Sequence, residues 1–97
     1  GIYKESQSQS NLIKNPSFSL QPNPANETVN IVFSEMELGS SQITIKDITG
    51  RIIFDQVISN SSLSLEINTS HFDQGIYVVE WIFSGQKPQT EKLTIIR

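Results

Sequence analysis

Apolar and polar residues alternate along most of the chain, a pattern that predicts β-strands rather than helices. The longest apolar stretch covers residues 75–84 and contains three aromatic residues, Tyr77, Trp81 and Phe83. These three would share one face of a strand, because successive side chains point to opposite faces, and Glu80 would lie on the other, wetter face. We therefore expect this strand to run through the middle of a sheet, with its aromatic rings anchoring the core.

Shorter alternating segments lie on both sides of this stretch, with turn-forming residues between them. They cover residues 28–34, 42–48, 51–58, 63–68 and 90–96, and residues 17–20 could add a short edge strand. No long helical pattern interrupts them, which excludes parallel βαβ architectures. The sequence thus predicts an all-β domain, an antiparallel two-sheet β-sandwich of immunoglobulin-like type with about seven strands. The order of the strands in the sheets does not follow from the pattern.

Two connections have a distinct turn chemistry. Residues 47–51 read as a tight hairpin, because Gly50 can adopt a positive φ and Asp47 can accept hydrogen bonds from the free amides of the turn. Residues 69–75 are too short for a helix, and we expect a single helical turn capped by Thr69 or Ser70, with Phe72 tucked under the sheet.

The two ends of the sequence differ in character. Residues 1–14 are rich in Ser, Gln and Asn and cannot bury enough apolar surface to order themselves, so we expect a flexible linker there and a single domain over residues 15–97. Because the sequence begins with Gly1 rather than Met, we expect either a piece of a longer precursor or an artificially introduced first residue. Pro22 and Pro24 remove two backbone donors and predict an extended turn before the first strong strand.

The length, cysteine content, net charge and apolar runs of the chain exclude or disfavour several classes of function. The 97 residues suit one domain, and the absence of cysteine excludes disulfides and thiolate chemistry. A formal charge of −3 argues against a nucleic-acid partner. No apolar run approaches the roughly 18–20 residues that a membrane-spanning helix needs.

The residues that could carry chemistry do not form a recognisable site. His71 is the single histidine and has no clustered partners, so a surface role is favoured over catalysis or metal binding. The carboxylates are dispersed without the spacing of a calcium loop, and no glycine-rich phosphate loop is present. Trp81 could stack on a sugar if it were exposed. It falls on the same strand face as Tyr77 and Phe83, however, which favours packing in the core. We therefore predict no enzyme activity, no catalytic or metal residue, no cofactor and no small-molecule substrate.

Four local features stand in an order that resembles a known family. They are Pro22-Asn23-Pro24-Ala25 before the first strong strand, the hairpin at 47–51, Gly75-Ile76-Tyr77-Val78-Val79 at the start of the anchor strand, and Lys92-Leu93 near the end. Together they look like the type A C-terminal sorting domain of the type IX (Por) secretion system of Bacteroidetes. The similarity covers about residues 15–97.

The resemblance implies a non-catalytic secretion signal that is itself a folded domain. Such a domain directs an attached cargo protein from the periplasm across the outer membrane, where the translocon recognises it and a sortase usually removes it at the cell surface. The implied partners are the translocon, the sortase and the upstream cargo, and residues 1–14 would hold the cleavage site. The implied location is the cell surface or the extracellular space.

The resemblance also assigns roles to individual residues. Pro22, Asn23 and Pro24 match the family's entry motif, Asp47 and Gly50 its hairpin, Gly75 and Tyr77 its penultimate strand, and Lys92 and Leu93 its last strand. Recognition by the translocon is associated with the C-terminal end, so the expected contact residues are Lys92, Leu93, Thr94, Ile95, Ile96 and Arg97. We expect the translocon to recognise the last strand, or the edge beside it, by strand addition, in which a strand of the partner pairs with the exposed sheet edge. An open edge strand could also pair with a second copy of the chain.

Two other functions remain open from the sequence. One is an accessory β-sandwich of a secreted enzyme or adhesin, which binds carbohydrate or a neighbouring domain and would expose an aromatic strip on one sheet. The other is a purely structural spacer, which would neither sort a cargo nor bind a glycan.

Overall fold

The computed structural model describes residues 17–34, 40–59, 64–83 and 87–97. Within these ranges the chain forms seven strands and no helix. The strands are β2 (Phe18–Gln21), β3 (Thr28–Phe33), β4 (Ser40–Asp47), β5 (Ile52–Ser59), β6 (Ser64–Asn68), β7 (Gly75–Phe83) and β8 (Gln89–Ile95). Each matches a segment predicted from the alternating pattern, and the short edge strand before Pro22 is present as β2.

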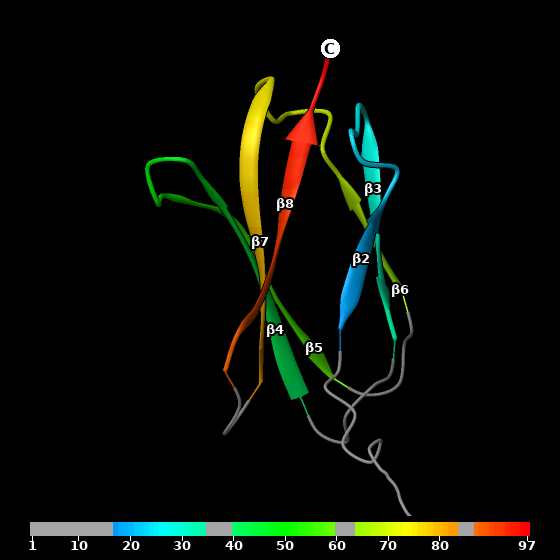
Figure 1. Cartoon of the computed structure of the whole chain (residues 1–97), viewed down its shortest axis with the longest axis vertical. Coiled ribbons are helices and arrows are strands. Elements are labelled where there is room, and N and C mark those ends of the chain that lie inside the picture. Colours follow the sequence, from blue (N-terminus) through cyan, green and yellow to red (C-terminus); the bar gives the residue numbers. More distant parts are fainter. Residues whose placement is uncertain (1–16, 35–39, 60–63, 84–86) are drawn as a thin grey trace, which may run out of the picture.

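The strands form two antiparallel sheets packed face to face (Figure 1). The smaller sheet has the order β2-β3-β6 and the larger the order β5-β4-β7-β8. The chain crosses between the layers after β3, after β5 and after β6, so that β3 pairs with β6 and β4 with β7. Such crossing connections are typical of immunoglobulin-like sandwiches. The predicted fold class is confirmed.

The core lies between the two layers, with Trp81 at its centre. Trp81 is fully buried, and its ring lies 4.8 Å from Phe33, 4.8 Å from Phe83 and 6.1 Å from Phe18 between centroids. Its indole Nε1–H donates a 2.9 Å hydrogen bond to Oγ of Ser41 on β4, so that its polar atom is satisfied within the core. The predicted anchor strand is therefore central in the larger sheet, and its aromatic face is buried.

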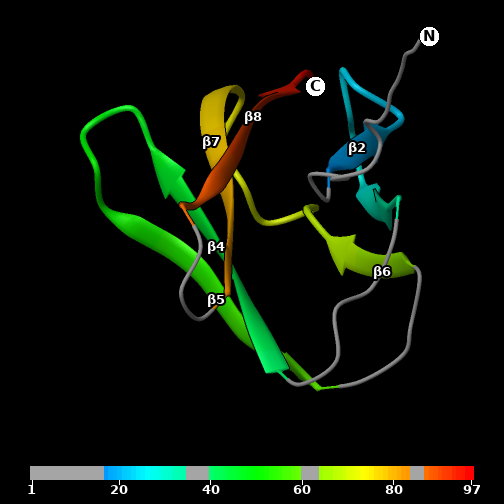
Figure 2. The same ribbon diagram turned by 60° about the horizontal axis from the view of Figure 1, so that its bottom comes forward.

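The β4–β5 hairpin extends beyond the smaller sheet, as Figure 2 shows. A register shift lies opposite Ile45 and Lys46, where the pairing moves from Phe54 to Ile52. Ile52 is 55% exposed and Val57 is 66% exposed, although both belong to an apolar segment. Ile52 lies opposite Lys46 and Val57 opposite Gln42. These two residues of β4 alternate with core residues, so Ile52 and Val57 lie on the outer face of the larger sheet, which points away from the core.

The connection between β6 and β7 differs from the expected helical turn. It is a hydrogen-bonded turn in which the amide of Phe72 donates to the carbonyl of Thr69 at 3.0 Å. Oδ1 of Asn68 accepts from the Ser70 amide at 2.9 Å, so Asn68 is the capping residue rather than Thr69 or Ser70. The hydroxyl of Thr69 instead donates to the carbonyl of Asn26 at 3.2 Å, and Phe72 is buried as expected.

The linker predicted for residues 1–14 and the domain start at Asn15 lie outside the described residues. In the described part of the chain, no helix is long and apolar enough to cross a membrane.

Candidate recognition surface around the last strand

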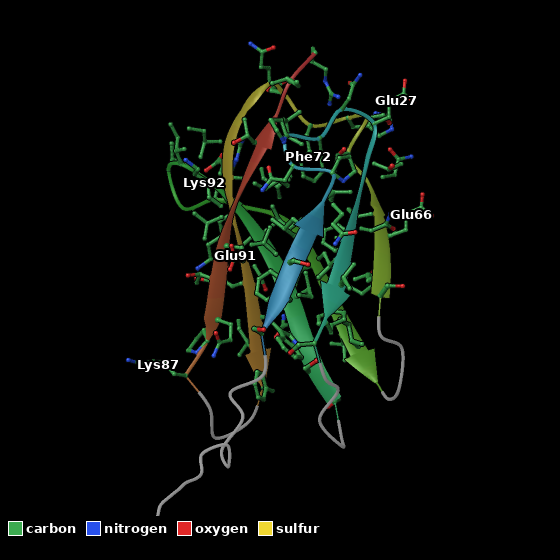
Figure 3. All side chains as sticks on the ribbon, turned by 45° about the vertical axis from the view of Figure 1, so that its right-hand side comes forward. Glu27, Glu66, Phe72, Lys87, Glu91 and Lys92 are labelled. Carbon is green, nitrogen blue, oxygen red and sulfur yellow. The ribbon has the colours of Figure 1, made fainter. Side chains whose placement is uncertain are left out.

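Strand β8 lies at one edge of the larger sheet and presents two different faces. Leu93 and Ile95 point into the sandwich and are fully buried. Lys92 is exposed, and Thr94 on the same face is half-buried. Figure 3 shows Glu91 and Lys92 on β8, away from Glu27 and Glu66 on the side of the smaller sheet. Of the predicted contact residues, Leu93 and Ile95 therefore serve the core.

Residues 22–26, which we call the strap, connect β2 to β3 and run alongside β8. The side-chain amide of Asn23 makes two hydrogen bonds with the β8 backbone. Its Nδ2 donates to the carbonyl of Lys92 at 2.8 Å, and its Oδ1 accepts from the amide of Thr94 at 3.0 Å. A single side chain thus binds the two backbone groups that a neighbouring strand would otherwise bind.

The backbone of Ala25 continues this pairing one step further along β8. Its amide donates to the carbonyl of Thr94 at 2.8 Å, and its carbonyl accepts from the amide of Ile96 at 2.9 Å. Ala25 and Ile95 form an isolated parallel bridge, and Ala25 is 1% exposed. From the carbonyl of Lys92 to the amide of Ile96, the edge of β8 is therefore occupied by the strap. This corrects our expectation of strand addition for that half of β8 in the folded chain.

Arg97 binds groups from two separate segments at the same end of the sandwich. Its Nη1 donates to Oδ1 of Asn26 at 2.9 Å and also to the Asn26 carbonyl. Its Nη2 donates to the carbonyl of Thr69 at 2.6 Å and also to the carbonyl of Phe72. The backbone amide of Arg97 donates to Oε1 of Gln74 at 3.1 Å. The guanidinium therefore ties the strap to the β6–β7 turn.

The remaining motif residues lie in a row across the larger sheet. Asp47 on β4 is opposite Tyr77 on β7, and Tyr77 is in turn opposite Leu93 on β8. The hydroxyl of Tyr77 donates a 2.6 Å hydrogen bond to the carbonyl of Asp73, four residues upstream. Gly75 opens the strand with φ of 153°, a region open to glycine and rarely adopted by other residues.

Asp47 organises the β4–β5 hairpin as the sequence predicted. Its Oδ1 accepts from the Thr49 amide at 2.9 Å, the Thr49 hydroxyl at 2.6 Å and the Arg51 amide at 3.0 Å. Its Oδ2 accepts from Nε of Arg51 at 3.2 Å. The hydrogen bond from the Thr49 side chain, joined by the backbone amides and the Arg51 charge, outweighs desolvation and lowers the pKa of Asp47. Gly50 has φ of 90°, the positive value that this turn requires.

The structure brings the motif residues from four distant segments to one end of the sandwich. The strap holds β8, and the hairpin and β7 residues line up beside it. Sequence reasoning did not foresee that Asn23 would bond across to β8 or that Arg97 would bind the strap. The only sequence signals were the polar residue between two prolines and a cationic side chain after the last strand.

The described residues show no arrangement suited to catalysis. Among them, no group of three His, Asp or Glu side chains could hold a metal ion. His71 is exposed in the β6–β7 turn. A cleft of about 300 Å³ lies between the β4–β5 hairpin and the β6–β7 turn, and the residues that line it include Ile48, Arg51, His71, Asp73 and Ile76.

A comparison with protein-family models matches residues 19–96 to the secretion system C-terminal sorting domain. No curated protein matches the chain. The fold and the structural motifs define a small β-sandwich module. The chain belongs to the family of C-terminal sorting domains of the type IX secretion system, as its motifs indicated. As a sorting signal of this family it acts with the type IX secretion machinery on an attached cargo protein, which is thereby secreted or displayed at the cell surface.

Proposed function

We propose that this domain directs its cargo from the periplasm across the outer membrane and is then removed by a sortase at the cell surface. The family match over residues 19–96 is the observation that carries this proposal. The chain supplies a rigid body for recognition, because the strap, the last strand and the β6–β7 turn are joined by hydrogen bonds. The linker predicted for residues 1–14 would hold the cleavage site.

We further propose that the translocon reads exposed side chains at the end of β8. Lys92 is exposed on the outer face, and Ile96, just beyond the strand, is 50% exposed. Leu93 and Ile95 contribute by keeping the strand in place, because both are fully buried. Arg97 contributes through its bonds to the strap and the turn. Recognition of side chains suits an edge whose backbone groups are already bound.

Deleting residues 92–97 would not test this contact cleanly, because it removes two buried core residues along with the exposed ones. Substitution of the exposed residues separates recognition from folding. The test variant is Lys92→Glu with Ile96→Ser, in a reporter fusion expressed in a host with a type IX system. The matched control is Lys87→Glu with Ile52→Ser, because Lys87 is exposed and Ile52 is 55% exposed.

The test variant should lower the fraction of reporter at the cell surface by about tenfold, the effect of losing one interfacial contact of roughly 1.4 kcal/mol. The control should be displayed as efficiently as the unchanged chain. Trp81 fluorescence of each purified fusion checks that the domain is folded. Full display of the folded test variant would contradict a contact at the end of β8.

The carbohydrate-binding alternative has no comparable support. It called for an aromatic strip exposed on one sheet, whereas Tyr77, Trp81 and Phe83 are all buried. The exposed apolar residues of the described strands are aliphatic.

A further inference from the structure

Strand β7 begins two residues before its pairing with β4 starts. The last paired residue of β4 is Asp47, which lies opposite Tyr77. The chain then turns into the β4–β5 hairpin, which diverges from β7 (Figure 1). On its other side, β7 stays paired with β8 as far as Gly75. Ile76 therefore has a neighbouring residue on β8 but none on β4.

The backbone groups of Ile76 point to the side that β4 leaves open. Both backbone groups of Thr94 on β8 point away from β7, because they bond to the strap. Thr94 lies opposite Ile76. In an antiparallel pair, two opposite residues either bond to each other or both point away from each other. The N–H and C=O of Ile76 therefore point away from β8, towards the side where β4 has ended.

Neither of these two groups forms a hydrogen bond with another described residue. The nearest residue of β4, Asp47, uses its own backbone groups within the hairpin. Its amide donates to the carbonyl of Arg51 at 3.0 Å, and its carbonyl accepts from the amide of Gly50 at 3.0 Å. Ile76 also lines the cleft of about 300 Å³ between the hairpin and the β6–β7 turn. The cleft thus offers the donor and the acceptor that a strand presents to its neighbour.

Aliphatic side chains accompany these groups in the cleft. Ile48 in the hairpin is 77% exposed, and Ile76 is 46% exposed. Ile53, at the start of β5, lines the same cleft. The volume is at the lower end of the range for ligand sites, so the cleft suits a short segment of extended chain.

The unpaired charge in the cleft is negative. Arg51 and Asp47 form an ion pair of 3.2 Å, whereas Asp73 is exposed and has no ion pair within the described ranges. His71 adds no formal charge at neutral pH. Burial, and then the charges of Asp73 and Asp47, raises the pKa of Tyr77, which lines the same cleft. A cationic side chain therefore matches the cleft better than an anionic one.

We propose that this cleft binds an extended peptide segment of a partner protein that carries a lysine or arginine side chain. The backbone of the segment pairs with Ile76 and continues the sheet where β4 leaves it. The apolar stem of the basic side chain lies against Ile48 and Ile76, and its charged head reaches towards Asp73. This inference goes beyond the sorting role and does not rest on it, so the purified full chain suffices to test it.

The probe is a peptide of sequence Thr-Val-Lys-Val-Thr with both ends blocked. Two matched peptides carry either Glu in place of the Lys or methyl groups on the three central backbone nitrogens. NMR of the isotope-labelled chain follows the amide of Ile76 at neutral pH while each peptide is added to about 10 mM, well above a Kd of about 1 mM.

The test variant is Asp73→Asn, which removes the charge but keeps the backbone carbonyl that binds the Tyr77 hydroxyl. The matched control is Glu66→Gln, the same kind of change at an exposed position on the side of the smaller sheet (Figure 3).

The Lys peptide should shift the Ile76 amide signal in a saturable manner and slow its exchange with solvent. The Glu peptide should bind about threefold more weakly or more, and Asp73→Asn should weaken binding of the Lys peptide by a similar factor, the usual size for one exposed ion pair. The methylated peptide should give no saturable shift, because it lacks the N–H donors. Glu66→Gln should bind the Lys peptide like the unchanged chain.

Trp81 fluorescence shows whether each variant is folded. If Asp73→Asn does not fold, the comparison of the Lys and Glu peptides on the unchanged chain provides the same test. The proposal would be overturned by an Ile76 signal that the Lys peptide does not shift, and equally by a Glu or methylated peptide that binds as tightly. An Ile76 signal that shifts when the chain alone is concentrated would mean that a second copy occupies the cleft, which also contradicts the proposal.

Discussion

The hydroxyl of Tyr77 donates a 2.6 Å hydrogen bond to the carbonyl oxygen of Asp73. This bond joins the start of β7 to the turn that precedes it, and the Tyr77 ring also packs 5.2 Å from Phe72 between centroids. A tyrosine at this corner, bonded to the backbone a few residues upstream, recurs in immunoglobulin-like sandwiches. The bond gives Tyr77 a structural role at the start of β7.

Replacing Tyr77 with phenylalanine should destabilise the domain by about 1 kcal/mol, the usual net effect of losing one hydrogen bond. The ring contact with Phe72 is kept, so the change isolates the hydroxyl. Chemical denaturation of the purified domain measures the difference. A free energy of unfolding equal to that of the wild type would mean that the corner bond adds nothing.

The same residue should make stability fall at alkaline pH. Burial, and then the negative charges of Asp73 and Asp47, raises the pKa of Tyr77 above its ordinary value of 10.0. The unfolded chain therefore loses this proton at a lower pH than the folded chain, so stability decreases as the pH rises from 10.0 through the folded pKa. Unfolding curves between pH 9 and about 11 should show a steeper loss for the wild type than for Tyr77→Phe, and parallel curves would contradict the raised pKa.

Asp47 should have the opposite effect at acid pH. Because its pKa is lowered from 3.8, the unfolded chain takes up the proton first, and the stability due to this carboxylate is present above 3.8 and lost as the pH falls through the folded pKa. Thermal melts between pH 6 and about 2 should therefore show a smaller acid loss for Asp47→Asn than for the wild type. If both lose the same stability over this range, the hairpin hydrogen bonds do not favour the charged form.

Gly50→Val should destabilise the domain by about 1 kcal/mol or more, because a β-branched residue is strained at a φ of 90°. The cost comes from the backbone alone, since a Cβ at Gly50 would have no other atom within 4 Å. Gly50→Asn is the matched control and should lose less, because asparagine tolerates this region. Equal melting temperatures for Gly50→Val and wild type would refute the role assigned to the turn.

Trp81 is the single tryptophan of the chain and therefore reports directly on the core. Its fluorescence should be blue-shifted, weakly quenched by acrylamide and unchanged by added glycans, because the side chain is fully buried. Trp81→Phe should cost about 1–3 kcal/mol, since it leaves a smaller ring and removes the donor that bonds to Ser41. Strong quenching or a response to glycans would favour the carbohydrate-binding reading instead.

Local patterns along the chain predicted the strands well because each depends on neighbouring residues. The aromatic face of β7 is buried, and Asp47 and Gly50 form the hairpin as their chemistry required. The exposure of Ile52 and Val57 was not predictable in this way, because apolar residues fall on both faces of β5 and the register with β4 decides which face points outward. The capping role of Asn68 was missed because three neighbouring polar residues offered similar chemistry.

The contacts that assemble the candidate site depend on residues far apart in the sequence. Asn23 bonds to the backbone of Lys92 and Thr94, which follow it by 69 and 71 residues. Arg97 likewise binds Asn26 and Thr69, in two different segments. No periodicity in a single sequence contains such pairings. The family resemblance singled out Asn23 and Lys92 as motif residues, but the hydrogen bond between them became apparent only in three dimensions.

The central claim is that this folded domain is itself the sorting signal, and a surface-display assay tests it most directly. A reporter with its own signal peptide is fused to the full chain in a host with a type IX system, and the fraction accessible at the cell surface is measured. We expect display with the unchanged chain, loss of display without the chain, and loss with Trp81→Ala, which should cost about 3–5 kcal/mol and unfold the core. A reporter that stays in the periplasm with the intact chain, or reaches the surface without it, would contradict the account.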